Sequence, residues 1–202
     1  MPTESDPLRY VALGDSYTIG TSVRAAESWP SQLVARVPTL RLVANLGVNG
    51  YSTDDLIADE LPQLPDLRPE FVTLLIGVND VVRGVPEQRY AANVVEILES
   101  LLGQLSADRI LCVATPNYTA TPQGAAFGSP DQQRAAIVRF NRRLGELCEA
   151  RGIRFVPEIF AISEAAATDR SLVAGDGLHP SGAQYLLWVD AIQPVIEELL
   201  RE

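Results

Sequence analysis

The sequence predicts an α/β fold: a three-layer α/β/α sandwich around a central five-stranded parallel sheet. Short apolar runs of strand length alternate with longer segments of helical period along the 202 residues. The runs are rich in Val, Leu and Ile without strict alternation, which is typical of parallel strands covered on both faces. This β-α-β-α order favours right-handed crossovers, and the length fits a single domain.

Strands are expected, in chain order, at residues 9–14, 41–46, 71–76, 109–114 and 154–156. Residues 86–105 carry the clearest helical period, an apolar stripe at steps of three and four residues. Further helices are expected over 131–151, from Ser181 to the C-terminus, and in shorter form over 28–37 and 53–61. The segments 117–130 and roughly 158–175 are expected to be long loops, which either help to shape a site or are flexible surface loops.

Composition and charge exclude several kinds of partner. The net charge is −10, so the surface should repel nucleic acid and anionic membranes. No apolar run reaches the length of a membrane-spanning helix, and the N-terminal residues MPTESDPLRY lack the pattern of a signal peptide. Cys112 and Cys148 lie at apolar positions and are expected to be reduced core residues. We therefore expect a cytoplasmic protein; its oligomeric state is not indicated.

A serine stands at the carboxyl end of the first expected strand, in VALGDSYTIG, where α/β sheets usually present their chemistry. Ser16 could be a turn residue, a helix cap or a nucleophile. His179 is the single histidine of the chain, and a turn through Gly177 can bring Asp176 beside it. Pro180 keeps His179 out of a helix, and Ser181 can cap the helix that follows. An acid, a base and a strand-end serine are the parts of a hydrolytic triad.

Two more strand ends offer donors for an oxyanion. Gly50 follows the second expected strand, and Asn79 follows the third. Glycines and Asn-Asp pairs are also ordinary turn chemistry, and Gly47, Asp15 and Asp80 are interpreted as structural, with Asp80 as a local cap that orients Asn79. The acidic residues Asp54, Asp55, Asp59 and Glu60 are interpreted as a solvated helix start. They lack a partner histidine, and no phosphate-binding glycine loop is present, so neither a metal nor another cofactor is expected.

Four blocks together resemble the SGNH hydrolase superfamily, the GDSL-type esterases and lipases. They are GDSY at 14–17, Gly50 in NGYS, GVND at 77–80 and DGLH at 176–179. Tyr17 stands where the namesake motif has leucine. The resemblance implies a flavodoxin-like SGNH hydrolase fold, Ser16 as nucleophile, His179 as general base and Asp176 as the group that orients it. It also implies an oxyanion hole made of the Ser16 and Gly50 backbone N–H groups and the Asn79 side-chain amide.

The resemblance predicts a serine ester hydrolase that works through an acyl-enzyme, on small-molecule esters. Five residues are candidates for lining its pocket: Tyr17, Tyr51, Val81, Val82 and Phe127. Their apolar character favours a small acyl or aryl ester. Acetylated carbohydrates, lysophospholipids and acyl thioesters remain alternatives within the superfamily, although the absence of a basic amphipathic segment disfavours a bulk lipid surface. A catalytically silent module that binds a small ligand is the alternative from another class.

Overall fold

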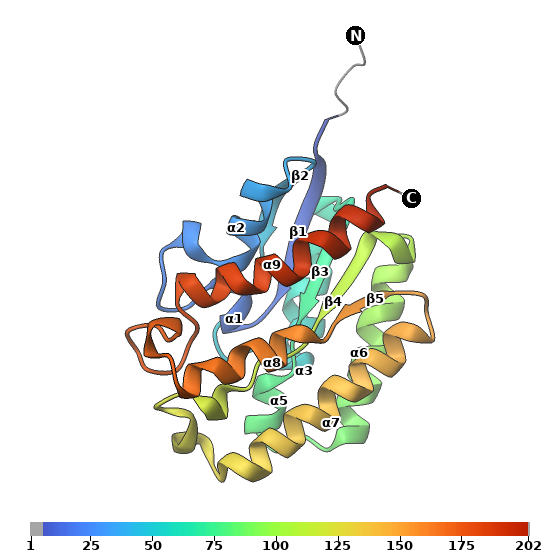
Figure 1. The fold of residues 1–202 in the computed structure, drawn as a ribbon. Coiled ribbons are helices and arrows are strands. Elements are labelled where there is room, and N and C mark those ends of the chain that lie inside the picture. The colour runs from blue at the N-terminus through green and yellow to red at the C-terminus, as the bar shows by residue number, and fades with distance from the viewer. Residues whose placement is uncertain (1–5, 202) are drawn as a thin grey trace.

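The computed structural model describes residues 6–201 and contains a parallel five-stranded sheet with helices on both faces (Figure 1). The strand order is β2-β1-β3-β4-β5. The strands are β1 (Leu8–Gly14), β2 (Leu40–Asn45), β3 (Phe71–Leu75), β4 (Ile110–Val113) and β5 (Arg154–Val156). The predicted fold class is confirmed, and each predicted strand end lies within one residue of the observed end.

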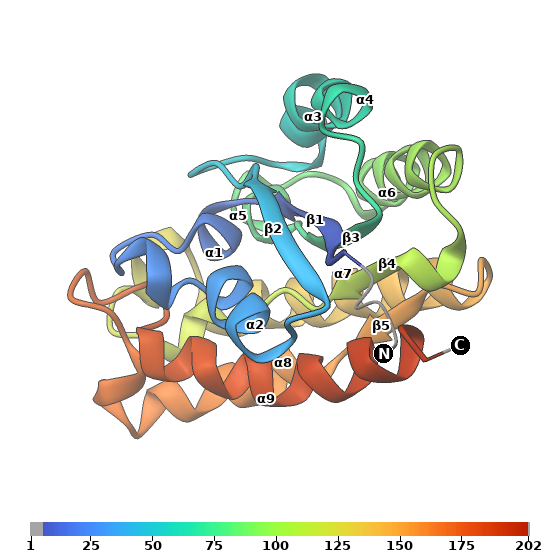
Figure 2. The ribbon, with the colours of Figure 1, turned by 90° about the horizontal axis from the view of Figure 1, so that it is seen from above.

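Helices cover the sheet in two layers, which are seen apart when the sheet is viewed from above (Figure 2). One layer holds α2 (Trp29–Arg36), α8 (Glu158–Glu164) and α9 (Gly182–Leu199). The other holds α3 (Thr53–Asp55), α6 (Glu87–Leu102) and α7 (Pro130–Glu149).

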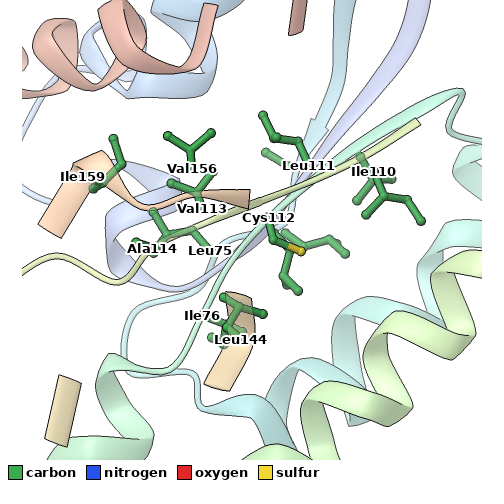
Figure 3. Close-up of a cluster of buried hydrophobic side chains, with 14 of the residues drawn as sticks. Leu75, Ile76, Ile110, Leu111, Cys112, Val113, Ala114, Leu144, Val156 and Ile159 are labelled. Atoms are coloured by element: carbon green, nitrogen blue, oxygen red, sulfur yellow. The ribbon is translucent and has the colours of Figure 1, made fainter. Parts of the chain in front are cut away.

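Strand β4 shows how the core between these layers is built. Its four residues are all fully buried, because helices cover both faces. Cys112 points toward Leu144 of α7, whereas Leu111 points to the opposite face (Figure 3). Alternating apolar side chains therefore enter both layers, which explains why the sequence of this strand is apolar at every position.

The connections differ from the sequence prediction in two places. The segment 158–175 was expected to be a loop, and that prediction is wrong: it contains α8 and two 3-10 turns, Ala165–Ala167 and Arg170–Leu172. The buried face of α8 and the next turn consists of Ile159, Ser163 and Ala166, too few large apolar groups to make a visible stripe. The predicted helix at 53–61 continues from α3 through a π turn (Leu56–Glu60) and a 3-10 turn (Leu61–Gln63) to α4 (Leu64–Leu67).

Two short helices begin at the carboxyl ends of strands, α1 (Ser16–Ile19) after β1 and α5 (Val78–Val82) after β3. Within residues 6–201, no helix combines the length and the apolar character that crossing a membrane requires. The expectation about a signal peptide falls partly on residues 1–5, which lie outside the described part of the chain.

Candidate active site

Ser16 is the first residue of α1 and follows a tight turn at the end of β1. Gly14 has φ +151°, and a Cβ there would lie 2.2 Å from the carbonyl oxygen of Leu75, so the turn requires glycine. Asp15 caps α1: its Oδ1 accepts a hydrogen bond of 2.9 Å from the Tyr17 N–H. The turn thus holds Ser16 at the carboxyl edge of the sheet.

The loop before α9 holds His179 and Asp176 together. The His179 Nδ1 lies 2.6 Å from Asp176 Oδ2, while Asp176 Oδ1 accepts hydrogen bonds from the backbone N–H groups of Leu178 and His179. Gly177 supplies the positive φ, +75°, that this turn needs. Ser181 follows as the N-cap of α9, so a rigid helix anchors the loop. The Asp176 contact leaves the other ring nitrogen, Nε2, free for proton transfer.

Ser22 is a contact of this pair that sequence reasoning missed. Its Oγ donates a hydrogen bond of 2.6 Å to Asp176 Oδ2, the same oxygen that faces His179. Ser22 has φ +67°, a strained value for a residue other than glycine. Desolvation raises the pKa of Asp176, but the hydrogen bonds from Ser22, Leu178 and His179 outweigh it and bring the pKa well below its usual value. Asp176 is therefore an anion at neutral pH.

Gly50 and Asn79 lie on neighbouring segments of the same sheet edge. Gly50 has φ +84° in the loop after β2, and Asn79 is the second residue of α5. One N–H of the Asn79 amide donates a hydrogen bond of 2.8 Å to the Tyr51 carbonyl. Since an amide nitrogen carries two hydrogens, the other remains available to a ligand.

A small cavity of about 50 Å³ opens at this edge of the sheet, and Gly50 is not among the residues that line it. Ser16, Asn79 and His179 contribute to its wall, so the strand-end serine, the amide and the imidazole face one space. The rest of the wall is apolar or aromatic: Tyr17, Val78, Val82, Tyr118, Phe127 and Leu178. Such a site combines a polar end with an apolar chamber.

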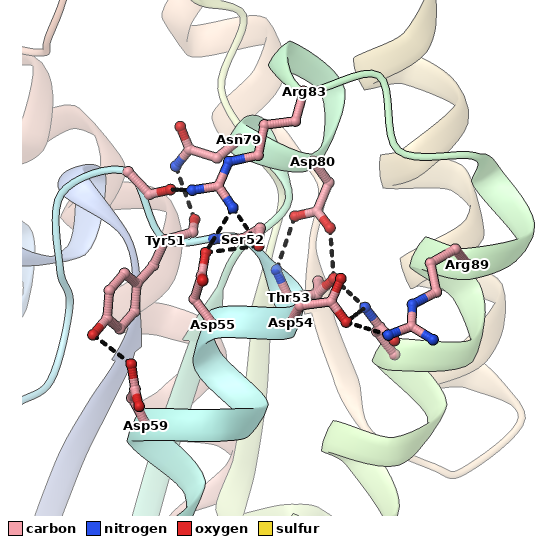
Figure 4. A network of polar contacts seen from close by, with 12 residues as sticks. Tyr51, Ser52, Thr53, Asp54, Asp55, Asp59, Asn79, Asp80, Arg83 and Arg89 are labelled. Atoms are coloured by element: carbon pink, nitrogen blue, oxygen red, sulfur yellow. Dashed lines mark hydrogen bonds and ion pairs between the residues drawn. The ribbon is translucent and has the colours of Figure 1, made fainter.

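Three of the five predicted pocket residues, Tyr17, Val82 and Phe127, line this cavity, and two do not. Val81 packs in the hydrophobic core and is not among the residues that line the cavity. Tyr51 is not among them either, and its hydroxyl donates a hydrogen bond of 2.8 Å to Asp59 (Figure 4).

Sequence reasoning missed three residues of the wall, Val78, Tyr118 and Leu178. Val78 and Leu178 each stand next to a predicted site residue along the chain, and this adjacency was the available signal. Tyr118 is the second residue of the segment 117–130, one of the two loops named as candidates for shaping the site. Its ring meets that of Phe127 edge-on at a centroid distance of 5.8 Å.

A buried carboxyl group lies behind the Ser16 turn. Glu60 was interpreted as part of a solvated helix start, and this is wrong: it is 1% exposed and its Oε2 accepts a hydrogen bond of 2.9 Å from the Gly14 N–H. Burial, with the nearby Asp15 and Asp59, raises the pKa of Glu60 to about 9. Burial and Asp80 likewise raise the pKa of Asp15 to about 8. Both groups are thus largely neutral at pH 7.

Asp80 does not cap its own turn as expected. It is fully buried and accepts hydrogen bonds from the Thr53 N–H and hydroxyl, so it joins α5 to α3 (Figure 4). Gly47 was interpreted as a turn glycine, but its role is close packing: a Cβ there would lie 2.7 Å from the Asp15 carbonyl oxygen.

No cluster of metal-ligating side chains accompanies this arrangement in the part of the chain that the structure describes. Across residues 6–201 no group of three or more His, Cys, Asp or Glu side chains is arranged to hold a metal ion. Cys112 and Cys148 are buried free thiols.

Comparison with known proteins identifies relatives of this chain. A sequence model of the GDSL-like Lipase/Acylhydrolase family matches residues 12–187. An arylesterase from Vibrio mimicus is 31% identical over 120 residues, which cover 54% of this chain and 57% of that protein. The chain therefore aligns with little more than half the length of this relative.

Two solved structures share the whole architecture. TesA gives a TM-score of 0.75 at 19% identity, over 95% of this chain and 99% of that chain. Axe2, an acetylxylan esterase from Geobacillus stearothermophilus, gives a TM-score of 0.73 at 20% identity, over 95% of this chain and 95% of that chain. Variants of Axe2 that carry a serine-to-alanine or a histidine-to-alanine change are described as catalytic mutants. At these identities the likeness shows a shared fold.

The fold and the family match define a class of hydrolytic enzymes. The chain belongs to the GDSL-like lipase/acylhydrolase family, which confirms the resemblance to SGNH hydrolases carried by the four sequence blocks.

Proposed function

We propose that the chain is a serine ester hydrolase in which Ser16, His179 and Asp176 form the catalytic triad. The observation that carries the proposal is the 2.6 Å contact of His179 Nδ1 with Asp176, in an imidazole that lines one cavity with Ser16. The ionised Asp176 fixes the ring so that Nε2 can accept a proton, and it stabilises the imidazolium that results. The arrangement suits acyl transfer.

The reaction then has two halves. Ser16 Oγ attacks the ester carbonyl carbon while its proton passes to His179 Nε2, and the carbonyl π electrons move to the oxygen. That oxyanion accepts hydrogen bonds from the Ser16 and Gly50 N–H groups and the Asn79 amide. When the C–O bond breaks, the alcohol leaves with the proton from His179. Water, deprotonated by His179, repeats the attack on the acyl-enzyme and releases the acid and Ser16.

Small acyl or aryl esters are the proposed substrates. The cavity of about 50 Å³ is large enough for a short acyl group but not for a long chain. Val78, Val82 and Leu178 give its walls an apolar character, and the edge-on pair of Tyr118 and Phe127 offers an aromatic surface to an aryl group. Phe127 is 40% exposed, so that surface extends to the mouth of the cavity.

The test is turnover of p-nitrophenyl esters from acetate to palmitate, beside an acetylated xylooligosaccharide and a lysophospholipid. We expect the highest kcat/KM for acetate to butyrate and a loss of nearly all turnover in Ser16→Ala. The matched control is Ser106→Ala, an exposed serine just before β4, at the opposite edge of the sheet, which should keep wild-type turnover.

The outcomes separate the alternatives. A preference for the acetylated sugar over every aryl ester would move the substrate to carbohydrate acetyl groups, and a preference for palmitate or the lysophospholipid would contradict the small-acyl proposal. No turnover of any ester by folded protein would favour a silent binding module.

A further inference from the structure

Arg83 lies at the carboxyl end of α5 and reaches across to the loop that carries Gly50. Its Nη2 donates a hydrogen bond of 2.7 Å to the Gly50 carbonyl oxygen. Its Nη1 donates to Ser52 Oγ at 3.0 Å and to Asp55 Oδ2 at 2.8 Å (Figure 4). One guanidinium thus spans the loop and the start of α3.

Asn79 contacts the same loop from one helical turn earlier. Its amide donates to the Tyr51 carbonyl, directly after the Gly50 carbonyl that Arg83 holds. Residues four apart on a helix lie on one face, so Asn79 and Arg83 hold two successive loop carbonyls from the same side of α5. The spacing between the Gly50 loop and the Asn79 amide is therefore set by these two side chains.

The Gly50 loop needs such a support because packing provides little. Gly50 is exposed, and a Cβ at this position would have no heavy atom within 4 Å. Glycine at φ +84° also has more backbone freedom than any other residue would. An oxyanion donor, by contrast, must be held in place before the reaction for its full effect.

Stability does not account for this contact. The Arg83 side chain is 50% exposed, and exposed ion pairs contribute little to folding stability. The start of α3 does not depend on it, since Ser52 and Asp55 already form a capping box. What Arg83 adds is the hydrogen bond to the Gly50 carbonyl.

We infer that Arg83 is a positioning residue: it holds the Gly50 loop against α5 so that the Gly50 N–H and the Asn79 amide converge on one oxyanion. This inference rests on the proposed function, because it presupposes that Gly50 and Asn79 bind an oxyanion. Arg83 itself touches neither Ser16 nor the reacting carbonyl in this role.

The test compares Arg83→Met and Arg83→Lys with Arg89→Met. Arg89 is an exposed arginine of α6 whose ion pair is with Asp54, away from the Gly50 loop, and it serves as the matched control. We expect Arg83→Met to lower kcat by about ten-fold to a hundred-fold, less than removal of an oxyanion donor itself, with KM nearly unchanged. Arg83→Lys, which keeps the charge but not the planar fork, should lie between Arg83→Met and wild type.

Two further measurements separate positioning from a merely structural role. Affinity for an alkyl boronic acid, which forms a tetrahedral adduct, should fall with kcat in Arg83→Met, while Tm stays within about two degrees of wild type. In Arg83→Ala, millimolar guanidinium chloride should restore part of kcat, but not in Ser16→Ala.

Unchanged kcat in Arg83→Met would overturn the inference, and so would a fall in kcat that follows Tm without any loss of boronate affinity. If Arg83→Met does not fold, Arg83→Lys decides by the same criteria. Failure of the proposed function would be detected separately: wild-type turnover would then not depend on Ser16. The Arg83 variants are compared only after that dependence is established, with every rate expressed relative to wild type.

Discussion

The buried carboxyl of Glu60 predicts an unusual pH dependence of folding stability, which Glu60→Gln should remove. Glutamine can accept the same hydrogen bond from the Gly14 N–H through its carbonyl oxygen. Its NH2 group takes the place of Oε1, which has no hydrogen-bond partner among residues 6–201. The substitution therefore keeps the shape and the contact and removes the ionisation.

The direction in which folding stability changes with pH follows from the pKa of Glu60 in the unfolded and folded states. Unfolded, Glu60 ionises near its ordinary pKa of 4.5, whereas burial raises the folded-state pKa to about 9. Between these values the unfolded state loses its proton while the folded state keeps it, so stability falls as pH rises. For one group the slope is about 1.4 kcal/mol per pH unit at most. We therefore expect equal stability of Glu60→Gln and wild type near pH 4, and an advantage of a few kcal/mol for the variant at pH 8.

The assay is urea unfolding at pH 4, 6 and 8, followed by circular dichroism, with the difference between variant and wild type taken at each pH. Titrating groups that do not interact with Glu60 cancel in that difference; Asp15 and Asp59, whose charges raise the pKa of Glu60, do not. The control is Glu96→Gln, an exposed glutamate of α6, which should show a flat difference. A Glu60→Gln difference that is also flat between pH 4 and 8 would refute the assignment of Glu60 as a buried neutral acid.

Substitutions at three other positions test the site. Asn79→Ala should lower kcat by about 10²–10³ with little change in KM, as expected for an oxyanion donor, and an unchanged kcat in steady-state ester assays would exclude that role. Ser22→Ala and Ser22→Gly should both lower kcat by roughly ten-fold, because each removes the hydroxyl that donates a hydrogen bond to Asp176. In urea unfolding, Ser22→Gly should be more stable than Ser22→Ala by about 1 kcal/mol, since glycine adopts φ +67° without strain. Equal stabilities of the two variants would contradict backbone strain at this position. Val82→Phe should fill the cavity and shift preference toward acetate in the p-nitrophenyl series, whereas an unaltered profile would place the acyl group elsewhere.

The parts of the site that could be predicted are those whose geometry depends on residues close together in the sequence. Gly14, two residues before Ser16, dictates local backbone geometry whatever lies around it, and so do Gly177 and Pro180 around His179. The same is true of the strands, since an apolar run buried on both faces can be recognised from its own composition.

The parts that could not be predicted depend on contacts between distant segments. Ser22 meets Asp176 across most of the chain, and Arg83 meets the Gly50 loop from another helix. Nothing in the residues around either position indicates its partner. Glu60 did leave a signal: Thr53, Leu56 and Glu60 are spaced as one helical face, and all three are buried.

The central claim is that Ser16 is a nucleophile activated by His179. The most direct measurement is intact-mass spectrometry after treatment with a fluorophosphonate, on wild type, Ser16→Ala and His179→Ala. The claim predicts a single adduct on wild type, none on Ser16→Ala and much slower labelling of His179→Ala. An adduct that persists in Ser16→Ala, or no adduct on folded wild-type protein, would contradict it.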